Sequence, residues 1–263
     1  MTKLRFSRKQ LCIPYAVFLI FFVIVPMLVI LFYAFTNRNG HFSVMNFVKF
    51  FSDPTKPSTI VYSIVIALIT TVACLLIAYP VAYILARSKL KRKSVILLLF
   101  ITPMWINFVL RVNAIRELMG WIGLLGEANY FNTVFGMVYD FLPFMILPLY
   151  TTISKIDNSL YEACADLGGT PVTCFFRVTV PLSMPGILSG ITMVFLPSMT
   201  NYVVSDMLGN SKVTIIGKFI YEYFGTDWHM GSMVALILLI VVFVSTWLSG
   251  GFKADENVRG ANL

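Results

Sequence analysis

The chain has 263 residues, of which 58% are hydrophobic and 12% are charged, and its mean hydropathy is +0.84. Soluble domains carry about 25% charged residues, so this composition excludes an ordinary soluble domain and favours a membrane protein. The net charge of +8 could suggest nucleic-acid binding, but the basic residues gather beside apolar runs, where positive charge sets the orientation of membrane helices. We therefore expect the lipid bilayer, and no nucleic acid, as a partner.

The first apolar run follows a basic start, an order that is also found in secretory signal peptides. The uncharged stretch from Gln10 to Asn37 covers 28 residues. It is longer than the apolar region of a signal peptide, which has about 7–15 residues, and no small-x-small cleavage site closes it. The sequence therefore predicts a retained transmembrane helix at about 12–35.

Five further segments are long and apolar enough to span a bilayer, which takes about 20 residues. They lie at about 59–86, 94–115, 131–153, 185–206 and 231–252. Seven prolines fall within the six predicted spans: Pro14, Pro26, Pro80, Pro103, Pro143, Pro148 and Pro197. Membrane helices tolerate proline when neighbouring helices satisfy the freed backbone groups, so we expect kinked helices packed together. The predicted fold class is an all-α membrane protein with six transmembrane helices.

The distribution of lysine and arginine predicts that both termini are cytoplasmic. With the N-terminus inside, segments 1–11, 87–93, 154–184 and 253–263 hold thirteen basic residues, whereas the outer segments 36–58, 111–130 and 207–230 hold seven. The four cysteines would then lie in spans or on the reducing side: Cys12, Cys74, Cys164 and Cys174. We therefore expect no disulfide bonds.

The sequence shows no catalytic or metal-binding motif. The cysteines and the two histidines, His41 and His229, lack the spacing of metal ligands. A phosphate-binding loop would read G-x-x-x-x-G-K-[ST], whereas the one Gly-Lys pair, Gly217–Lys218, is followed by Phe and lacks the first glycine at that spacing. An intramembrane hydrolase would need a nucleophile–base pair, which we do not find. We expect no metal site, no ATP site and no enzyme activity in this chain by itself.

Charged residues at membrane depth indicate function by default, because burying them there is costly. Asp140 lies about 13 Å into the fourth predicted span at about 1.5 Å per residue, and Asp206 closes the fifth. One interpretation is that these acids line a path for a cationic substrate, with cation–π contacts from Trp105, Tyr139 or Tyr202. The alternative is that Asp140 and Arg111 neutralise each other. The sequence leaves both interpretations open.

The predicted cytoplasmic loop between the fourth and fifth spans is glycine- and proline-punctuated. Asn158 or Ser159 can cap a short helix that Gly168–Gly169 end, and Pro171 favours the start of a second helix. Gly186-x-x-x-Gly190 then lets the fifth span approach a neighbour closely. Two short helices with small side chains form a knob that suits protein docking, and an ordinary amphipathic interfacial loop is the alternative.

This loop resembles the EAA signature of the permease subunits of binding-protein-dependent ABC importers. The signature is Glu-Ala-Ala, three residues, Gly, nine residues, then Ile-x-Leu-Pro. The matching positions are Glu162, Ala163, Cys164, Gly168, Val178, Val180 and Pro181, with Cys164 in place of the second Ala and valines in place of Ile and Leu. In that family the loop is a coupling helix that docks on a separate ATPase subunit. The resemblance implies this role for Glu162, Ala163, Cys164, Asp166, Gly168 and Pro181.

Four further segments resemble spermidine/putrescine permeases: Pro103–Val112, Leu142–Asp157, Pro181–Gly190 and Tyr202–Ile220. The resemblance implies a type I ABC importer permease fold in a bacterial cytoplasmic (inner) membrane. Residues 1–58 would form the N-terminal segment, the first span and an outer loop. Residues 59–252 would form the permease core with the coupling loop at 155–184, and 253–263 a cytoplasmic tail.

The resemblance also implies the partners and the substrate. The partners would be a homologous second permease, an ATP-binding subunit dimer that uses ATP and Mg, and an extracytoplasmic substrate-binding protein, with no cofactor in this chain. The substrate would be a polyamine, and the residues proposed to line its path are Asp140, Asp206, Trp105 and Tyr202. Two alternatives remain, an ABC permease for another small substrate and an autonomous channel or secondary carrier.

Overall fold

The computed structural model describes residues 12–88, 91–125, 129–209 and 213–248. Every regular element in these ranges is helical, apart from an isolated antiparallel bridge between Thr36 and Phe42. The predicted basic start and the tail at 253–263 lie outside the described residues. The chain divides into two compact units, one of Met1–Pro57 with Phe219–Ile240 and one of Ser58–Lys218 with Val241–Leu263.

The first unit begins with the predicted first span, which is confirmed. α1 (Cys12–Leu19), the π-helical η2 (Ile20–Ile24) and α2 (Val25–Ala34) follow one another without a break, and Ile13–Ala34 is long and apolar enough to cross a membrane. Pro26 lies within this continuous helical run, directly after the π-helical η2, and its missing N–H leaves a carbonyl of the preceding turn without that helical hydrogen bond. α3 (Met45–Ser52) follows in the same unit.

A small polar cluster joins the end of α2 to the start of α13 (Trp228–Leu248) in the first unit. Asp227 precedes α13 and accepts hydrogen bonds from the N–H groups of His229 and Met230, at 3.1 and 3.4 Å. Asp227 also pairs with Arg38 at 3.1 Å, and His229 Nδ1 lies 3.2 Å from the Tyr33 carbonyl oxygen. His229 is therefore engaged in a structural contact between helices.

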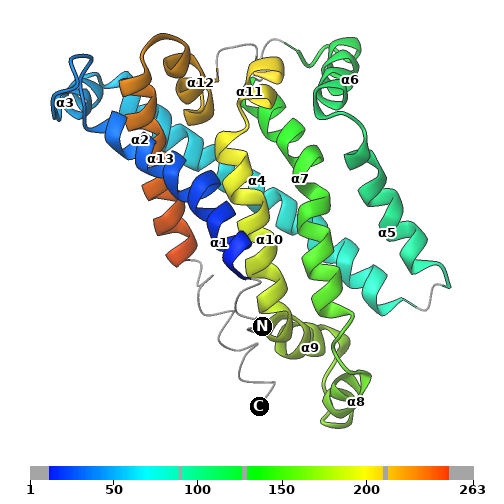
Figure 1. The fold of residues 1–263 in the computed structure, drawn as a ribbon. Helices are drawn as coiled ribbons and strands as arrows, with labels where there is room; N and C mark the ends of the chain where they lie inside the picture. The colour runs from blue at the N-terminus through cyan, green and yellow to red at the C-terminus, as the bar shows by residue number, and fades with distance from the viewer. Residues whose placement is uncertain (1–11, 89–90, 126–128, 210–212, 249–263) are drawn as a thin grey trace, which may run out of the picture. The chain divides into compact units, whose positions relative to one another are not determined.

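The second unit is built on three long helices, α4 (Thr55–Arg87), α7 (Asn129–Ile153) and α10 (Val180–Thr200). Figure 1 shows α7 and α10 beside one another, with α4 crossing behind them. The buried face of α4 carries small residues at helical spacing, among them Ala67, Cys74, Ala78 and Ala82. Small side chains let helix backbones approach closely, which is how membrane helices gain packing energy. The core of the unit lies between these helices.

The third predicted span is broken, so the prediction of one continuous helix over 94–115 is wrong. α5 (Lys93–Ile101) and the 3₁₀ turn η3 (Thr102–Trp105) are bent by 96° from α6 (Phe108–Trp121). Ile106 is extended, and the Asn107 side chain accepts a hydrogen bond from Val109 N–H at 2.9 Å, which starts a new helix. The described chain thus has five helices able to cross a membrane, or six if this bent pair counts as one span.

The fifth span begins earlier and ends earlier than the predicted 185–206. The spanning stretch is Pro171–Thr200, comprising α9 (Pro171–Cys174), the π-helical η4 (Phe175–Thr179) and α10. Pro181 lies in the first turn of α10 and is accommodated there. Asn201 leaves helical geometry and caps α11 (Tyr202–Leu208), so Asp206 belongs to α11. α12 (Ile216–Thr226) then precedes α13.

Two glycines set the spacing between α10 and α7, as the Gly186-x-x-x-Gly190 pattern predicts. A Cβ on Gly186 would lie 2.6 Å from Thr152 Oγ1 and 2.9 Å from the Pro148 carbonyl oxygen, and one on Gly190 would lie 2.5 Å from Met145 Sδ. The prediction of a close helix approach at these glycines is confirmed. Since the Pro148 carbonyl is backbone, it cannot move aside as a flexible side chain would.

Replacing Gly186 with alanine should force α10 away from α7. Overpacking of this kind costs about 1–3 kcal/mol, so we expect Gly186→Ala to lower the midpoint of thermal unfolding in detergent. Gly225→Ala is the matched control, because a Cβ on this helical glycine meets nothing within 4 Å. An equal fall in both variants would show that the α7–α10 contact is not responsible.

Candidate functional site

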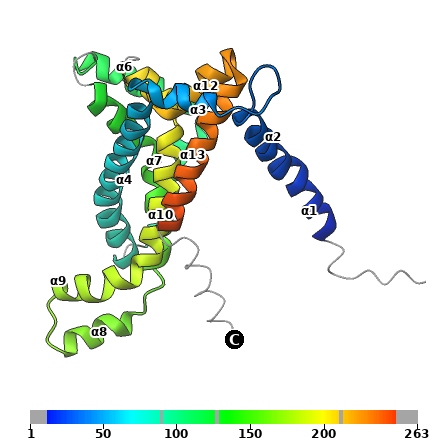
Figure 2. The same cartoon turned by 90° about the vertical axis from the view of Figure 1, so that its left-hand side faces the viewer.

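The loop between α7 and α10 forms a knob, defined here as residues 157–179. It comprises α8 (Asn158–Asp166), α9 and η4. Figures 1 and 2 show α8 and α9 at one end of the second unit, with α6 and α11 at the opposite end. The prediction of two short helices in this loop is confirmed. The contacts between these helices distinguish a docking knob from an ordinary amphipathic surface loop.

Local capping residues determine where the short helices of the knob begin and where α8 ends. Asp157, rather than the predicted Asn158 or Ser159, caps α8, and its side chain accepts from Ser159 N–H at 3.0 Å. This hydrogen bond lowers the pKa of the Asp157 carboxyl below its ordinary value. Gly168 ends the helix with a φ of +76°, a conformation that glycine adopts readily. Thr170 then caps α9, with Pro171 at its first position, as predicted.

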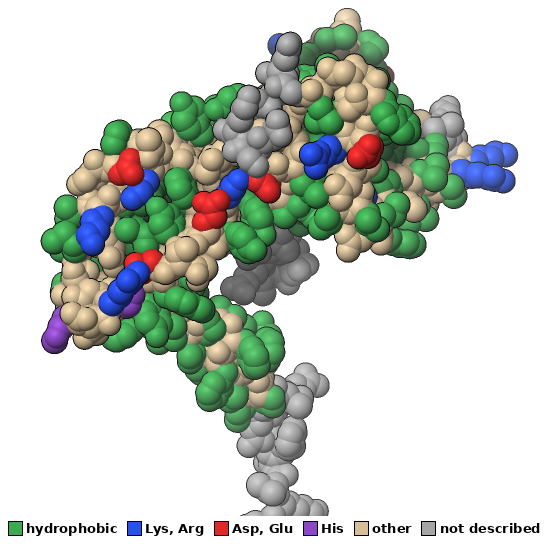
Figure 3. All heavy atoms as spheres, turned by 90° about the horizontal axis from the view of Figure 1, so that it is seen from above, with side chains coloured by type: hydrophobic (Ala, Val, Ile, Leu, Met, Phe, Trp, Pro, Cys, Tyr) green, Lys and Arg blue, Asp and Glu red, His purple; other side chains and the backbone are tan. Residues whose placement is uncertain are grey.

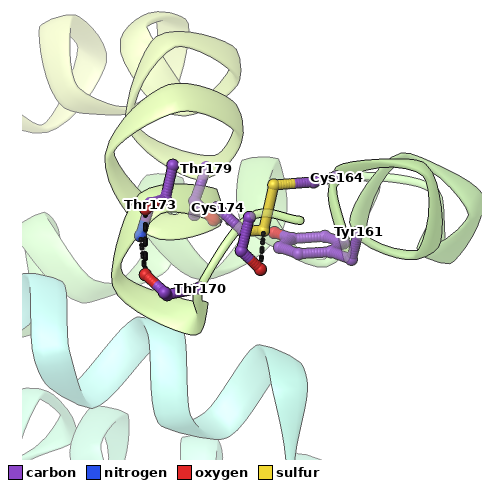
Figure 4. The surroundings of a disulfide bond; sticks show 7 residues. Tyr161, Cys164, Thr170, Thr173, Cys174 and Thr179 are labelled. Carbon is purple, nitrogen blue, oxygen red and sulfur yellow. Dashed lines mark hydrogen bonds between the residues drawn. A yellow bond between two sulfur atoms is a disulfide. The ribbon is translucent and has the colours of Figure 1, made fainter. Parts of the chain in front are cut away.

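A disulfide bond joins Cys164 on α8 to Cys174 on α9, which Figure 4 shows with its surroundings. The expectation that the cysteines are unpaired is wrong for these two, while Cys74 is free and buried. The glycine turn brings the two helices together: a Cβ on Gly169 would lie 2.7 Å from Cys164 Sγ and 3.2 Å from Cys174 Sγ. Cys164 and Cys174 are ten residues apart in the sequence, and this spacing alone did not indicate that they form a disulfide. The tight turn between α8 and α9 is what brings their sulfur atoms together.

The two helical arms of the knob are also joined by a side-chain contact. The hydroxyl groups of Tyr161 on α8 and Thr179 on η4 lie 3.0 Å apart, and Thr179 is buried (Figure 4). Together with the disulfide, this contact connects α8 to the chain that leads into α10. The knob is therefore a cross-braced structure and not a simple surface-lying helix.

An apolar surface is exposed on the knob. Leu167 is 90% exposed, and Leu160, Val172 and Phe176 are exposed as well. A hollow of about 430 Å³ is lined by Leu160, Ala163, Cys164, Leu167, Gly168, Gly169, Thr173, Arg177 and Val178. The structure thus brings Ala163, Cys164 and Gly168 to one hollow. Glu162 and Asp166 are exposed on α8, whereas Pro181 lies outside the knob, in the first turn of α10.

The charged residues predicted to line a substrate path occur as ion pairs. Arg111 on α6 lies 3.2 Å from Asp140 on α7, with 10% and 1% of the respective side chains exposed. Neither carboxylate oxygen of Asp140 has a hydrogen-bond partner within the described chain, and the same holds for Arg111 Nε. This geometry is that of the neutralising pair. It leaves the Asp140 carboxylate short of partners inside the helix bundle.

The other three predicted path residues lie toward the end of the unit opposite the knob. Asp206 on α11 pairs with Lys218 on α12 at 2.6 Å. Tyr202 is the first residue of α11, and Trp105 lies at the bend between η3 and α6 with 79% of its surface exposed. The view onto this end in Figure 3 shows acidic and basic side chains beside one another. In the described part of the chain, no group of three His, Cys, Asp or Glu side chains could hold a metal ion.

Several long apolar helices, interrupted by a braced knob, define a multi-pass membrane protein. The family model described as binding-protein-dependent transport system inner membrane component matches residues 78–253. The chain belongs to this family and is a permease subunit of an ABC importer, located in the inner membrane.

Curated relatives and solved structures agree with this assignment. The chain is 35% identical over 247 residues to the spermidine/putrescine transport system permease protein PotB of Haemophilus influenzae, covering 85% of this chain and 86% of the relative. It is 34% identical over 247 residues to the PotB protein of Escherichia coli K12, covering 85% and 90%. A crystal structure of a bacterial ABC transporter involved in the import of the acidic polysaccharide alginate has the same fold, with a TM-score of 0.75, 15% identity and 94% of both chains covered.

Removing the Asp157 cap should loosen α8 locally. Loss of an N-cap side chain leaves the first N–H groups of the helix without that partner, so we expect Asp157→Ala to speed amide hydrogen exchange at the start of α8. Because the folded pKa of Asp157 is lowered, the ionised cap stabilises α8 above the ordinary pKa, and this contribution is lost as the pH falls through the folded pKa.

Asp166→Ala is the matched control at the other end of α8. An acid there opposes the helix dipole, so its removal should leave exchange in α8 equal or slower. Faster exchange in both variants would argue against the capping role of Asp157.

Proposed function

We propose that this permease subunit carries polyamines across the inner membrane and that its knob is the docking element for a separate ATPase. The observation that carries the docking role is the braced, apolar knob at one end of the helix unit, which holds Ala163, Cys164 and Gly168 around one hollow. Exposed apolar surface held in a fixed shape is typical of protein interaction sites.

Three features support partner proteins on separate chains. The sequence lacks a phosphate-binding loop, so ATP hydrolysis would come from the partner. The EAA spacing begins in the knob, with Gly168 at the turn that ends α8, and it ends at Pro181 in α10. The alginate transporter that shares this fold has also been solved in complex with a periplasmic protein. We therefore propose an ATP-binding dimer, a second permease and an extracytoplasmic substrate-binding protein as partners.

The proposed mechanism is alternating access. A binding protein delivers substrate to the outer face, and ATP binding closes the ATPase dimer. The knob moves with the ATPase, and the helices change their packing so that the path opens to the other side. The bracing by the disulfide and by the Tyr161–Thr179 contact supports this role, because a rigid knob transmits displacement where a loose loop would absorb it.

The polyamine substrate is supported by identities of about 34% to spermidine/putrescine permeases. Asp140 and Asp206 would supply the negative charge that a polyamine needs, with its ammonium groups competing with Arg111 and Lys218 for the carboxylates. Trp105 and Tyr202 would add cation–π contacts. The alternatives are a permease for another small substrate and an autonomous carrier. Competition among putrescine, spermidine, thiamine and anions tests the first, and uptake by the purified chain alone in liposomes tests the second.

Gly168→Asp should abolish transport-coupled ATP hydrolysis while leaving membrane insertion intact, because it places charge and a strained backbone at the proposed docking turn. Gly123→Asp is the matched control. Gly123 also has a positive φ, +72°, with nothing within 4 Å of a Cβ, and it follows α6 at the other end of the unit. Normal uptake by Gly168→Asp, or equal loss in both variants, would contradict the docking role.

Asp140→Asn and Asp206→Asn should each raise the half-saturation concentration for polyamine uptake about tenfold, since a hydrogen bond to a charged group contributes about 1.5–3 kcal/mol. Asp53→Asn is the control, because Asp53 pairs with Lys56 just before α4, away from the proposed path residues in the sequence. Unchanged half-saturation concentrations in both test variants would rule out the acid-lined path.

A further inference from the structure

The knob is joined through the chain to only two of the three long helices of its unit. α8 follows α7 through a short connection, and η4 runs directly into α10. α4 is distant in sequence, so any displacement of the knob reaches α4 only through side-chain contacts. These contacts are concentrated in the last three turns of α4.

Arg87, the last residue of α4, holds α8 by two contacts. Its guanidinium carbon lies 3.6 Å from the centroid of the Tyr161 ring, and its Nη1 donates to Asn158 Oδ1 at 2.8 Å. A cation over an aromatic face is attracted by the negative face of the ring, and the planar guanidinium can stack and donate at once, which a lysine cannot do. Arg87 therefore positions both the first and the second turn of α8.

Two tyrosines higher on α4 hold the other arm of the knob. The rings of Tyr79 and Tyr83 lie edge-on to Phe175 of η4, with centroids 5.5 and 5.1 Å apart. The Tyr79 hydroxyl also lies 2.8 Å from Ser183 Oγ on α10. Since Tyr161 of α8 contacts Thr179 of η4, the contacts form a closed ring from α4 to α8, to η4 and back to α4.

The far end of α4 contacts the segment that carries the Asp206–Lys218 pair. Ser63 Oγ of α4 accepts a hydrogen bond from Ile216 N–H at 2.7 Å, and Ile216 begins α12, two residues before Lys218. Ser63 and Arg87 are 24 residues apart, which is about 36 Å along a helix at about 1.5 Å per residue. One continuous helix, which contains Pro80, thus connects the knob with the opposite end of the unit.

We infer that Arg87 is a positioning residue that makes α4 follow the knob, through its stacking on Tyr161 and its hydrogen bond to Asn158. This inference rests on the proposed docking function of the knob. Without Arg87, the knob would still pull on α7 and α10 through the chain, but α4 and its contact at Ile216 would lag behind. ATP hydrolysis would then proceed with less transport.

The residues around Arg87 fit this role. A hollow of about 750 Å³ beside the contact has Ala86, Arg87, Lys93, Asn158 and Tyr161 in its lining. Lys93 donates to the carbonyl oxygen of Ala86 at 3.0 Å, which secures the end of α4 independently of Arg87. Removing the guanidinium should therefore break the link to α8 without unwinding α4.

The test is the amount of substrate transported per ATP hydrolysed by the complete complex in proteoliposomes. Arg87→Met keeps the length of the side chain and removes the cation. We expect it to lower this ratio about fivefold, equivalent to about 1 kcal/mol at about 1.4 kcal/mol per tenfold, with copurification of the ATPase unchanged. Tyr161→Leu removes the stacking but keeps the hydrogen bond from Arg87 to Asn158, and it should also lower the ratio. The loss in the double variant should be smaller than the sum of the two single losses, because the stacking can be removed only once.

Three further variants separate positioning from folding or topology. Arg92→Met removes one positive charge from the same basic segment at an exposed site, and it should leave the ratio unchanged. Tyr161→Phe keeps the ring beneath Arg87 and should retain most of the ratio, and Arg87→Lys should recover part of it. An unchanged ratio in Arg87→Met, a loss as large in Arg92→Met, or additive losses in the double variant would overturn the inference.

Failure of this inference is distinguishable from failure of the proposed docking function. If the knob docks but Arg87 does not transmit, Gly168→Asp abolishes coupled hydrolysis while Arg87→Met transports normally. If the knob does not dock, Gly168→Asp retains coupled hydrolysis, and Arg87→Met also leaves the ratio unchanged.

Discussion

The close packing of α10 against α7 is the contact on which the rest of the second unit depends. Gly186 and Gly190 allow α10 to approach the backbone of α7 at Pro148 and the side chain of Met145. The α8 connection leaves α7 at one end of this pair and η4 enters α10 at the same end, so the pair holds both attachment points of the knob. At the other end, α11 continues from α10 and packs on α6 and α7.

The second unit also buries a pair of oppositely charged side chains. The Arg111–Asp140 pair lies between α6 and α7 with almost no exposed surface. Burying such a pair costs desolvation that its mutual attraction barely offsets, and here the carboxylate oxygens lack further hydrogen bonds within the described chain. The proposed exchange of Arg111 for a substrate ammonium group would give these carboxylate oxygens a further partner.

Where local chemistry decides a structure, the sequence predicted it well. The first span, the two short helices of the loop, the stop at Gly168 and the glycine approach of α10 all follow from apolar length, capping residues and small side chains. The break at Ile106–Asn107 had a local signal as well, an asparagine cap after Pro103, but the apolar pattern on both sides concealed it. The fifth span was misplaced because the helical run begins at Pro171 and continues through Pro181 and Pro185, where prolines ordinarily interrupt a helix.

The contacts between distant segments could not be predicted in this way. Cys164 and Cys174 lie ten residues apart, and their pairing depends on how tightly Gly168 and Gly169 fold the chain. Arg87 and Tyr161 are separated by three helices in the sequence, and nothing in either local pattern indicates their stacking. The choice between a neutralising Asp140 and an unpaired one likewise depends on the bend that places Arg111 beside α7.

The sequence by itself determined that this is a multi-pass membrane protein of the ABC importer permease family. The length of each apolar run and the EAA spacing can both be read from short stretches of consecutive residues. Tertiary structure alone decided how the knob is braced, where the charged residues pair and which residue ties α4 to α8. Those features depend on the relative position of helices that are far apart in the chain, and packing, rather than any short motif, sets that position.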